Sequence, residues 1–106
     1  MSYSHLSPAE AKAAIEADPE LFVLDVRTAP EFRMHRIDGA VLLPIQELMQ
    51  RVAELDPSRS YLVTCEHGVR SRMACDYLAS VGFASLRNLS GGMANWVGAG
   101  LPVVRG

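Results

Sequence analysis

Cys65 is the residue whose surroundings in the sequence best suit a nucleophile. It follows the apolar run 61–64 and precedes Glu-His-Gly-Val-Arg-Ser, where a helix is expected to begin. Gly68 permits backbone angles that other residues avoid, and a tight loop at a helix start turns N–H groups inward to bind an anion. A helix N-terminus and a cation such as Arg70 favour the thiolate form of a cysteine. The pattern predicts a reactive Cys65 thiolate rather than a cysteine that only fills space in the core.

The residues after Cys65 allow more than one role each. Arg70 can bind a donor anion or pair with a carboxylate, and we expect a role in the site. Ser71 is placed either to hydrogen-bond Cys65 or to cap the helix. His67 is expected at the loop tip, solvated or able to influence the choice of acceptor. Cys75 lies too far along the helix to serve as a resolving thiol and is expected in the core.

Asp25 and Arg27 follow a second apolar run, 21–24, and are expected beside the crevice that holds Cys65. Their opposite charges suggest a structural ion pair, which Glu31 is a candidate to join and which would support the site. His5 and His35 are isolated in the sequence and show no ligand spacing with either cysteine. No metal site is therefore expected.

The elements that must position these residues alternate along the chain. Strands are predicted over 21–24, 40–43, 61–64 and 85–89, and helices over 8–17, 30–34, 46–55, 70–81 and 93–99. The first helix has a clear start, with Ser7 as N-cap, Pro8 in the first turn and Glu10 completing a capping box. Alternating strands and helices indicate an α/β fold with a mostly parallel sheet, whose strand carboxyl ends hold the functional residues.

The composition limits the possible functions. The chain has 106 residues, of which 49% are hydrophobic and 21% charged, which suits one domain over 1–106. A net charge of −2 without a Lys/Arg cluster argues against nucleic acid as a partner. The short apolar runs predict no membrane span. With no leader pattern in residues 1–5 and only two cysteines, we expect a cytoplasmic protein with reduced thiols.

Four segments resemble the rhodanese-like family, in the family's order. Cys65, Gly68, Arg70 and Ser71 match its Cys-x-x-Gly-x-Arg-Ser loop. Leu24-Asp25-Val26-Arg27 resembles the family's strand end, and Glu31-Phe32 with Ile37-Asp38-Gly39-Ala40 resembles the segment after it. The C-terminal part of the family is matched by Gly91-Gly92-Met93, Trp96 and Gly100-Leu101-Pro102-Val103. The resemblance spans about residues 6–104. The chain departs from the family at His35-Arg36, where Gly-His is usual.

The resemblance implies a three-layer α/β/α fold with a central, mostly parallel sheet of about five strands. It also implies a sulfurtransferase, in which Cys65 takes a sulfane sulfur from thiosulfate or a persulfide and passes it to a thiol, a protein sulfur acceptor or cyanide. No metal or organic cofactor is implied. Asp25 and Arg27 are expected to support a substrate site lined by Glu66, His67, Gly68, Val69, Arg70 and Ser71. Because Glu66 would oppose the charge of thiosulfate, we expect weak thiosulfate binding and better reaction with a persulfide.

Two other functions stay in view. A phosphatase or arsenate reductase on the related fold has Cys-x5-Arg, whereas Cys65 and Arg70 form a shorter Cys-x4-Arg loop, which is expected to be too tight for a phosphoryl group. A non-catalytic interaction module is the other alternative. The presence of Cys65 argues against it, although a persulfide carrier for one protein partner fits the same residues.

Overall fold

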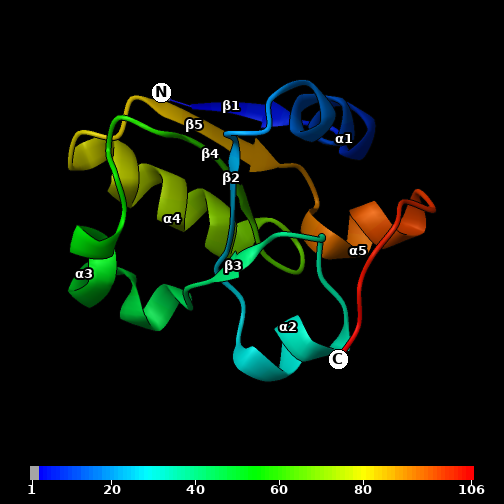
Figure 1. Cartoon of the computed structure of the whole chain (residues 1–106). Coiled ribbons are helices and arrows are strands. Elements are labelled where there is room, and N and C mark those ends of the chain that lie inside the picture. Colours follow the sequence, from blue (N-terminus) through cyan, green and yellow to red (C-terminus); the bar gives the residue numbers. More distant parts are fainter. Residues whose placement is uncertain (1–2) are drawn as a thin grey trace.

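The computed structural model describes residues 3–106, in which a five-stranded parallel sheet forms the centre of the molecule (Figure 1). The strand order is β1-β5-β4-β2-β3, and every pair of neighbours is parallel. The strands are β1 (Tyr3–Leu6), β2 (Phe22–Asp25), β3 (Val41–Leu42), β4 (Ser60–Thr64) and β5 (Ser85–Leu89). The predicted α/β class is confirmed, and the edge strand β1 is an addition to the strands expected from the sequence. Met1 and Ser2, which belong to the N-terminal stretch without a leader pattern, lie outside the described residues.

The helices follow the strands in the predicted alternation. They are α1 (Pro8–Ala17), α2 (Ala29–Met34), α3 (Leu48–Arg51), α4 (Val69–Ser80) and α5 (Gly92–Gly98). The helical segment predicted over 46–55 is confirmed in part: it contains one α turn, α3, flanked by two 3₁₀ segments, η1 (Ile45–Glu47) and η2 (Val52–Glu54). The backbone of Glu47 and Arg51, with φ near −104° and −114°, departs from regular helix at both junctions.

Two capping boxes fix the starts of α1 and α2. At α1, the Ser7 hydroxyl accepts from the Glu10 N–H, and the Glu10 carboxylate accepts from the Ser7 N–H, as predicted. At α2, Thr28 and Glu31 repeat the arrangement. The second box orients Glu31, whose carboxylate also reaches the Cys65 loop.

Helices cover both faces of the sheet and give three layers. In β2 and β4, Leu24 and Val63 point into one core, while Val23 and Leu62 point into the other, as the period of a strand requires. The first core contains residues of α3 and α4, and the second contains residues of α1 and α5. In Figure 1 these two pairs of helices lie on opposite sides of the sheet.

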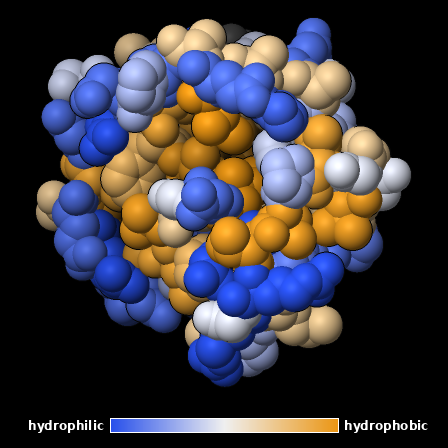
Figure 2. Space-filling view, turned by 45° about the vertical axis from the view of Figure 1, so that its right-hand side comes forward, coloured by the Kyte–Doolittle hydropathy of each residue, from blue (hydrophilic) through white to orange (hydrophobic). Residues whose placement is uncertain are grey.

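The face that carries α1 and α5 is hollowed. Figure 2 brings this side forward and shows hydrophobic residues around a hollow, with hydrophilic residues at the rim. A groove of about 350 Å³ lies here, between α1 and the C-terminal segment, with Ile15, Ile37 and Trp96 in its lining. Among residues 3–106, no helix has the length and apolar character needed to cross a bilayer.

The carboxyl ends of β2 and β4 lie side by side and carry the residues singled out in the sequence. Asp25, the last residue of β2, is in register with Thr64, the last residue of β4. Cys65 follows at once and begins the loop to α4. Parallel pairing therefore places Asp25 and the Cys65 loop at one edge of the sheet, as predicted.

Candidate active site

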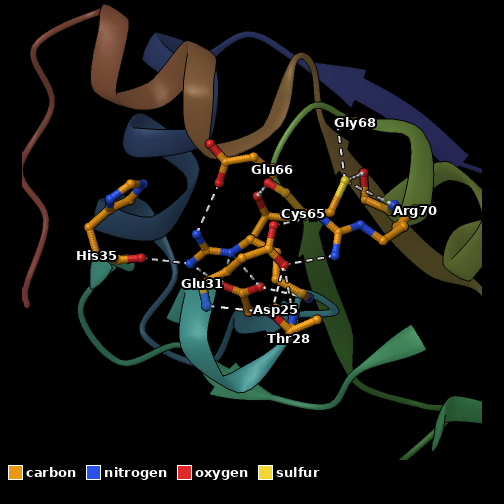
Figure 3. Close-up of polar contacts among 11 residues, drawn as sticks. Asp25, Thr28, Glu31, His35, Cys65, Glu66, Gly68 and Arg70 are labelled. Carbon is orange, nitrogen blue, oxygen red and sulfur yellow. Dashed lines mark hydrogen bonds and ion pairs between the residues drawn. The ribbon is translucent and has the colours of Figure 1, made fainter. Parts of the chain in front are cut away.

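The sulfur of Cys65 lies at the focus of backbone N–H groups (Figure 3). Gly68 N–H and Ser71 N–H donate to Sγ at 3.0 and 3.2 Å. Gly68 takes a left-handed conformation with φ of 93° and is the N-cap of α4, so the glycine is required for the turn that aims these groups. Cys65 is only 1% exposed. Two donors and a helix N-terminus directed at one buried sulfur suit a thiolate.

The start of α5 holds the backbone of the Cys65 loop from behind. Met93 N–H donates to the Cys65 carbonyl at 2.8 Å, and Ala94 N–H donates to the Glu66 carbonyl at 2.9 Å. In a trans peptide the N–H points opposite to the C=O, so the N–H groups of Glu66 and His67 point away from α5. Within residues 3–106, the loop N–H groups of Glu66, His67, Val69 and Arg70 have no hydrogen-bond acceptor. They are available to an anion.

Arg27 is the buried cation of the site. Its guanidinium is fully buried and donates to the Asp25 carboxylate through Nε and Nη2, the shortest distance being 2.8 Å. It also donates to the His35 carbonyl at 2.7 Å and to Glu66 Oε1 at 3.2 Å. The Asp25–Arg27 pair predicted from the sequence is thus present. Removing one partner of such a buried pair costs about 3–5 kcal/mol, because the other charge is left uncompensated.

Glu66 occupies a different position from the one expected. Its carboxylate turns to Arg27 instead of standing alone against an incoming anion (Figure 3). The ion pair offsets part of the repulsion that the sequence suggested. The backbone of Glu66, rather than its side chain, faces the loop interior.

Arg70 forms a two-point ion pair with Glu31. Its two terminal nitrogens donate to the two carboxylate oxygens at 2.8 and 2.9 Å, joining the first turn of α4 to α2. The hydrogen bond from Arg70 lowers the pKa of Glu31 to about 2, aided by the Thr28 backbone and hydroxyl. Glu31 therefore pairs with Arg70, and the expectation that it joins the Asp25–Arg27 pair is wrong. Of the two roles considered for Arg70, the structure displays the carboxylate pair.

The charged side chains of the site nearly cancel. Two guanidinium groups, of Arg27 and Arg70, face three carboxylates, of Asp25, Glu31 and Glu66. Their sum is −1. The favourable field at the sulfur therefore comes chiefly from the inward N–H groups and the helix N-terminus.

Ser71 contacts the sulfur and does not cap α4. Its Oγ lies 3.3 Å from Sγ and donates to Asn88 Oδ1 at 2.6 Å. The N-cap of α4 is Gly68, and it forms no side-chain cap bond. Of the two roles left open for Ser71, the structure selects the contact with Cys65.

The side chains of the remaining candidates lie outside the sulfur site. Cys75 is fully buried, and burial raises the pKa of its thiol to about 12. His67 is exposed at the loop tip, as expected. His35 ends α2 in an extended conformation with φ of −168°, which any residue adopts, so the usual glycine is not required there. Residues 3–106 hold no group of three or more His, Cys, Asp or Glu that could share a metal ion.

Three contributors to the site were not assigned these roles from the sequence. Gly92 allows α5 to approach the loop, because a β-carbon there would lie 2.4 Å from the Cys65 carbonyl oxygen. Asn88 is a buried polar residue within β5. Glu31 holds Arg70. Two signals in the sequence mark the first two: the consecutive glycines Gly91 and Gly92 at the start of a helix, and an asparagine that alternates with Leu86 on one face of β5.

Comparison with known proteins agrees with this geometry. A relative from Bacillus subtilis (strain 168), named YtwF, is 35% identical over 96% of this chain and 98% of its own length. A protein of Allochromatium vinosum named a sulfurtransferase is 36% identical over 83% of each chain. The crystal structure of a rhodanese-related protein from Thermoplasma volcanium superposes with a TM-score of 0.88 at 31% identity, covering 96% of this chain and 98% of that one. The family model of the rhodanese-like domain matches residues 7–99, and the chain belongs to the rhodanese-like family.

Proposed function

We propose that this protein is a sulfurtransferase that carries a sulfane sulfur as a persulfide on Cys65. The observation that supports this most directly is the pair of N–H groups, from Gly68 and Ser71, that donate to the buried sulfur at 3.0 and 3.2 Å. The sulfurtransferase names among the relatives point to the same chemistry. The free loop N–H groups can hold the second sulfur of a persulfide without any cation.

The reaction consists of two displacements at sulfur. In the first, the Cys65 thiolate attacks the outer sulfur of thiosulfate; the new S–S bond forms as the old one breaks, and sulfite leaves with the electron pair. In the second, an acceptor thiolate or cyanide attacks the outer sulfur of the Cys65 persulfide. The products are a new persulfide or thiocyanate, and the Cys65 thiolate is regenerated. No net oxidation occurs, and no cofactor enters the scheme.

Each persulfide state is an anion, and the loop backbone is its main partner. Because the five charged side chains sum to −1, a donor with two negative charges gains little from them. A donor with a single charge, such as a low-molecular-weight or protein persulfide, experiences less repulsion. We therefore propose a persulfide as the preferred donor and a thiol as the acceptor. Two free cysteines fit a reducing compartment, which supports a cytoplasmic location.

The assay that tests this function is thiocyanate formation from thiosulfate and cyanide, repeated with a persulfide donor. The wild-type protein should turn over with both donors and show the lower Michaelis constant with the persulfide. Cys65→Ser should be inactive with both. The proposal would be overturned if the wild-type protein showed no turnover with thiosulfate and none with the persulfide.

A further inference from the structure

A buried chain of hydrogen bonds leads from the Cys65 sulfur to a histidine at the surface. Sγ contacts Ser71 Oγ at 3.3 Å, Ser71 Oγ donates to Asn88 Oδ1 at 2.6 Å, and Asn88 Nδ2 lies 3.0 Å from His5 Nδ1. Ser71 and Asn88 are buried, whereas His5 is exposed. The chain crosses from α4 to β5 and then to β1, where His5 and Asn88 are in register. The two displacements described above use neither Asn88 nor His5.

The direction of each bond follows from the groups involved. An amide NH₂ only donates, so His5 Nδ1 is the acceptor in this contact. Asn88 then presents its carbonyl to Ser71, whose single hydroxyl proton is used there. Toward Cys65, the hydroxyl can only accept. This arrangement matches a thiol S–H, and it gives a thiolate no donor from the Ser71 side chain.

We propose that Asn88 is a positioning residue that sets the protonation of Cys65 through the Ser71 hydroxyl, with His5 holding the amide in place. If the Asn88 amide turns so that Nδ2 faces Ser71, the Ser71 hydroxyl loses its acceptor on Asn88. It then donates its hydrogen bond to Cys65 Sγ instead. The thiolate then gains a donor in addition to the N–H groups of Gly68 and Ser71. Protonation of His5 at Nδ1 requires this turn, because the new Nδ1–H is a donor and needs the carbonyl oxygen of Asn88, not its NH₂, as partner. A surface histidine is thereby coupled to the reactivity of a buried thiol.

Other ionisable groups lie near both ends of this series of hydrogen bonds, at His5 and at Cys65. His5 and Asn88 line a cavity of about 200 Å³ together with His67, Gly68, Arg72, Ser90 and Gly91. The Tyr3 ring lies 5.3 Å from the His5 ring, and burial together with the Asp76 carboxylate raises the pKa of the Tyr3 hydroxyl to about 12. At the sulfur, Arg70 and Cys75 of α4 interact electrostatically with Cys65. These groups form a background that a change at Asn88 leaves in place.

The test is a pH titration of the ultraviolet absorbance of the thiolate, taken as the difference between each protein and its Cys65→Ser counterpart. Asn88→Leu, which is close to isosteric, frees the Ser71 hydroxyl and should lower the midpoint by roughly 0.5–1 pH unit, the effect of one hydrogen bond. In a Ser71→Ala background the same change should leave the midpoint unmoved. Asn95→Ala is the matched control, because its amide bonds the Ser90 carbonyl instead, and it should keep the wild-type midpoint.

A second variant leaves the core untouched. His5→Lys places a permanent donor beside Asn88 and should lower the midpoint more when Ser71 is present than in Ser71→Ala, where only the added charge acts. An unchanged midpoint in folded Asn88→Leu, or a shift from His5→Lys of equal size with and without the Ser71 hydroxyl, would overturn the proposal. The inference rests on the proposed function only in taking the Cys65 thiolate as the attacking group. The titration uses no sulfur donor, so it is read independently of whether a persulfide forms.

Discussion

Gly92 and Cys65 are in closer contact than any side chain at position 92 would allow. A β-carbon on Gly92 would lie 2.4 Å from the Cys65 carbonyl oxygen and 2.6 Å from the Glu66 carbonyl carbon and oxygen. This contact lets the N–H groups of Met93 and Ala94 hold both carbonyls from behind. The inward orientation of the loop N–H groups therefore depends on a glycine 27 residues downstream of the nucleophile.

Gly92→Ala should displace the Cys65 loop. Gly92 has φ of 63°, so alanine adds backbone strain to the clash, and the unfolding free energy should fall by about 2 kcal/mol or more. Sulfur transfer should fall by about 10- to 100-fold, the loss expected when reacting groups are misplaced. Gly98→Ala in the same helix is the control, because a β-carbon at position 98 would have nothing within 4 Å. Denaturant titrations and turnover of the two variants give the comparison, and equal behaviour would contradict the account.

Glu31→Gln should improve the binding of thiosulfate by releasing Arg70. Glutamine keeps the capping function at this position of α2, while the two-point pair with Arg70 is lost. We expect the Michaelis constant for thiosulfate to fall about three- to tenfold at low ionic strength, and less at high salt. Steady-state kinetics at two salt concentrations provide the measurement.

Glu66→Gln is the matched variant for this effect. The variant removes one negative charge, as Glu31→Gln does, but leaves Arg70 bound to Glu31. In the wild-type protein the Glu66 carboxylate is already paired with Arg27. The Michaelis constant should therefore fall less than in Glu31→Gln. A larger fall in Glu66→Gln would show that its carboxylate, and not Glu31, limits the approach of the anion.

The Glu31–Arg70 pair should also appear in the acid dependence of stability. The pKa of Glu31 is lowered from 4.5 to about 2 in the folded protein, so the folded state binds this proton more weakly than the unfolded chain. The stabilisation is complete above about pH 5 and is lost as the pH falls toward 2. Urea denaturation at several pH values should show a difference between wild type and Glu31→Gln that shrinks over this range. A difference that stays constant from pH 6 to the acid limit would contradict the shift.

The sequence was informative where the signal is local. Ser7, Pro8 and Glu10 predict the start of α1 because a capping box involves neighbouring residues only. The Cys65 loop could be predicted for the same reason, since Gly68 and the helix start adjoin it. Strand β1 could not be predicted because its sequence, Tyr-Ser-His-Leu, is short and half polar, and its partner β5 lies about eighty residues away in the chain.

Contacts between distant segments could not be predicted from sequence patterns. The sequence predicts that Arg27 and Arg70 belong to the site, but which carboxylate each binds depends on how α2 and the loop dock on the sheet. The same holds for Asn88, whose burial next to Ser71 results from β5 lying beside β4. The residue types in the site were thus apparent, while their pairing required the tertiary structure.

Cys75→Ala should leave sulfur transfer within about twofold of the wild-type rate. The thiol is fully buried and its pKa is raised to about 12, so at neutral pH it is neither ionised nor accessible as a second nucleophile. Loss of its packing should cost about 1 kcal/mol of unfolding free energy. Turnover and denaturant titration of the purified variant test both parts. A collapse of activity in a stably folded Cys75→Ala would indicate a two-cysteine mechanism.

The intact mass of the protein after incubation with a sulfur donor tests the central claim most directly. With thiosulfate or a low-molecular-weight persulfide, the wild-type protein and Cys75→Ala should each gain the mass of one sulfur atom, mapped to the peptide that contains Cys65. The gain should disappear on addition of cyanide. Cys65→Ser, which stays folded because the change is small, should gain nothing. A sulfur adduct on Cys65→Ser, or no adduct on the folded wild-type protein with either donor, would contradict the account.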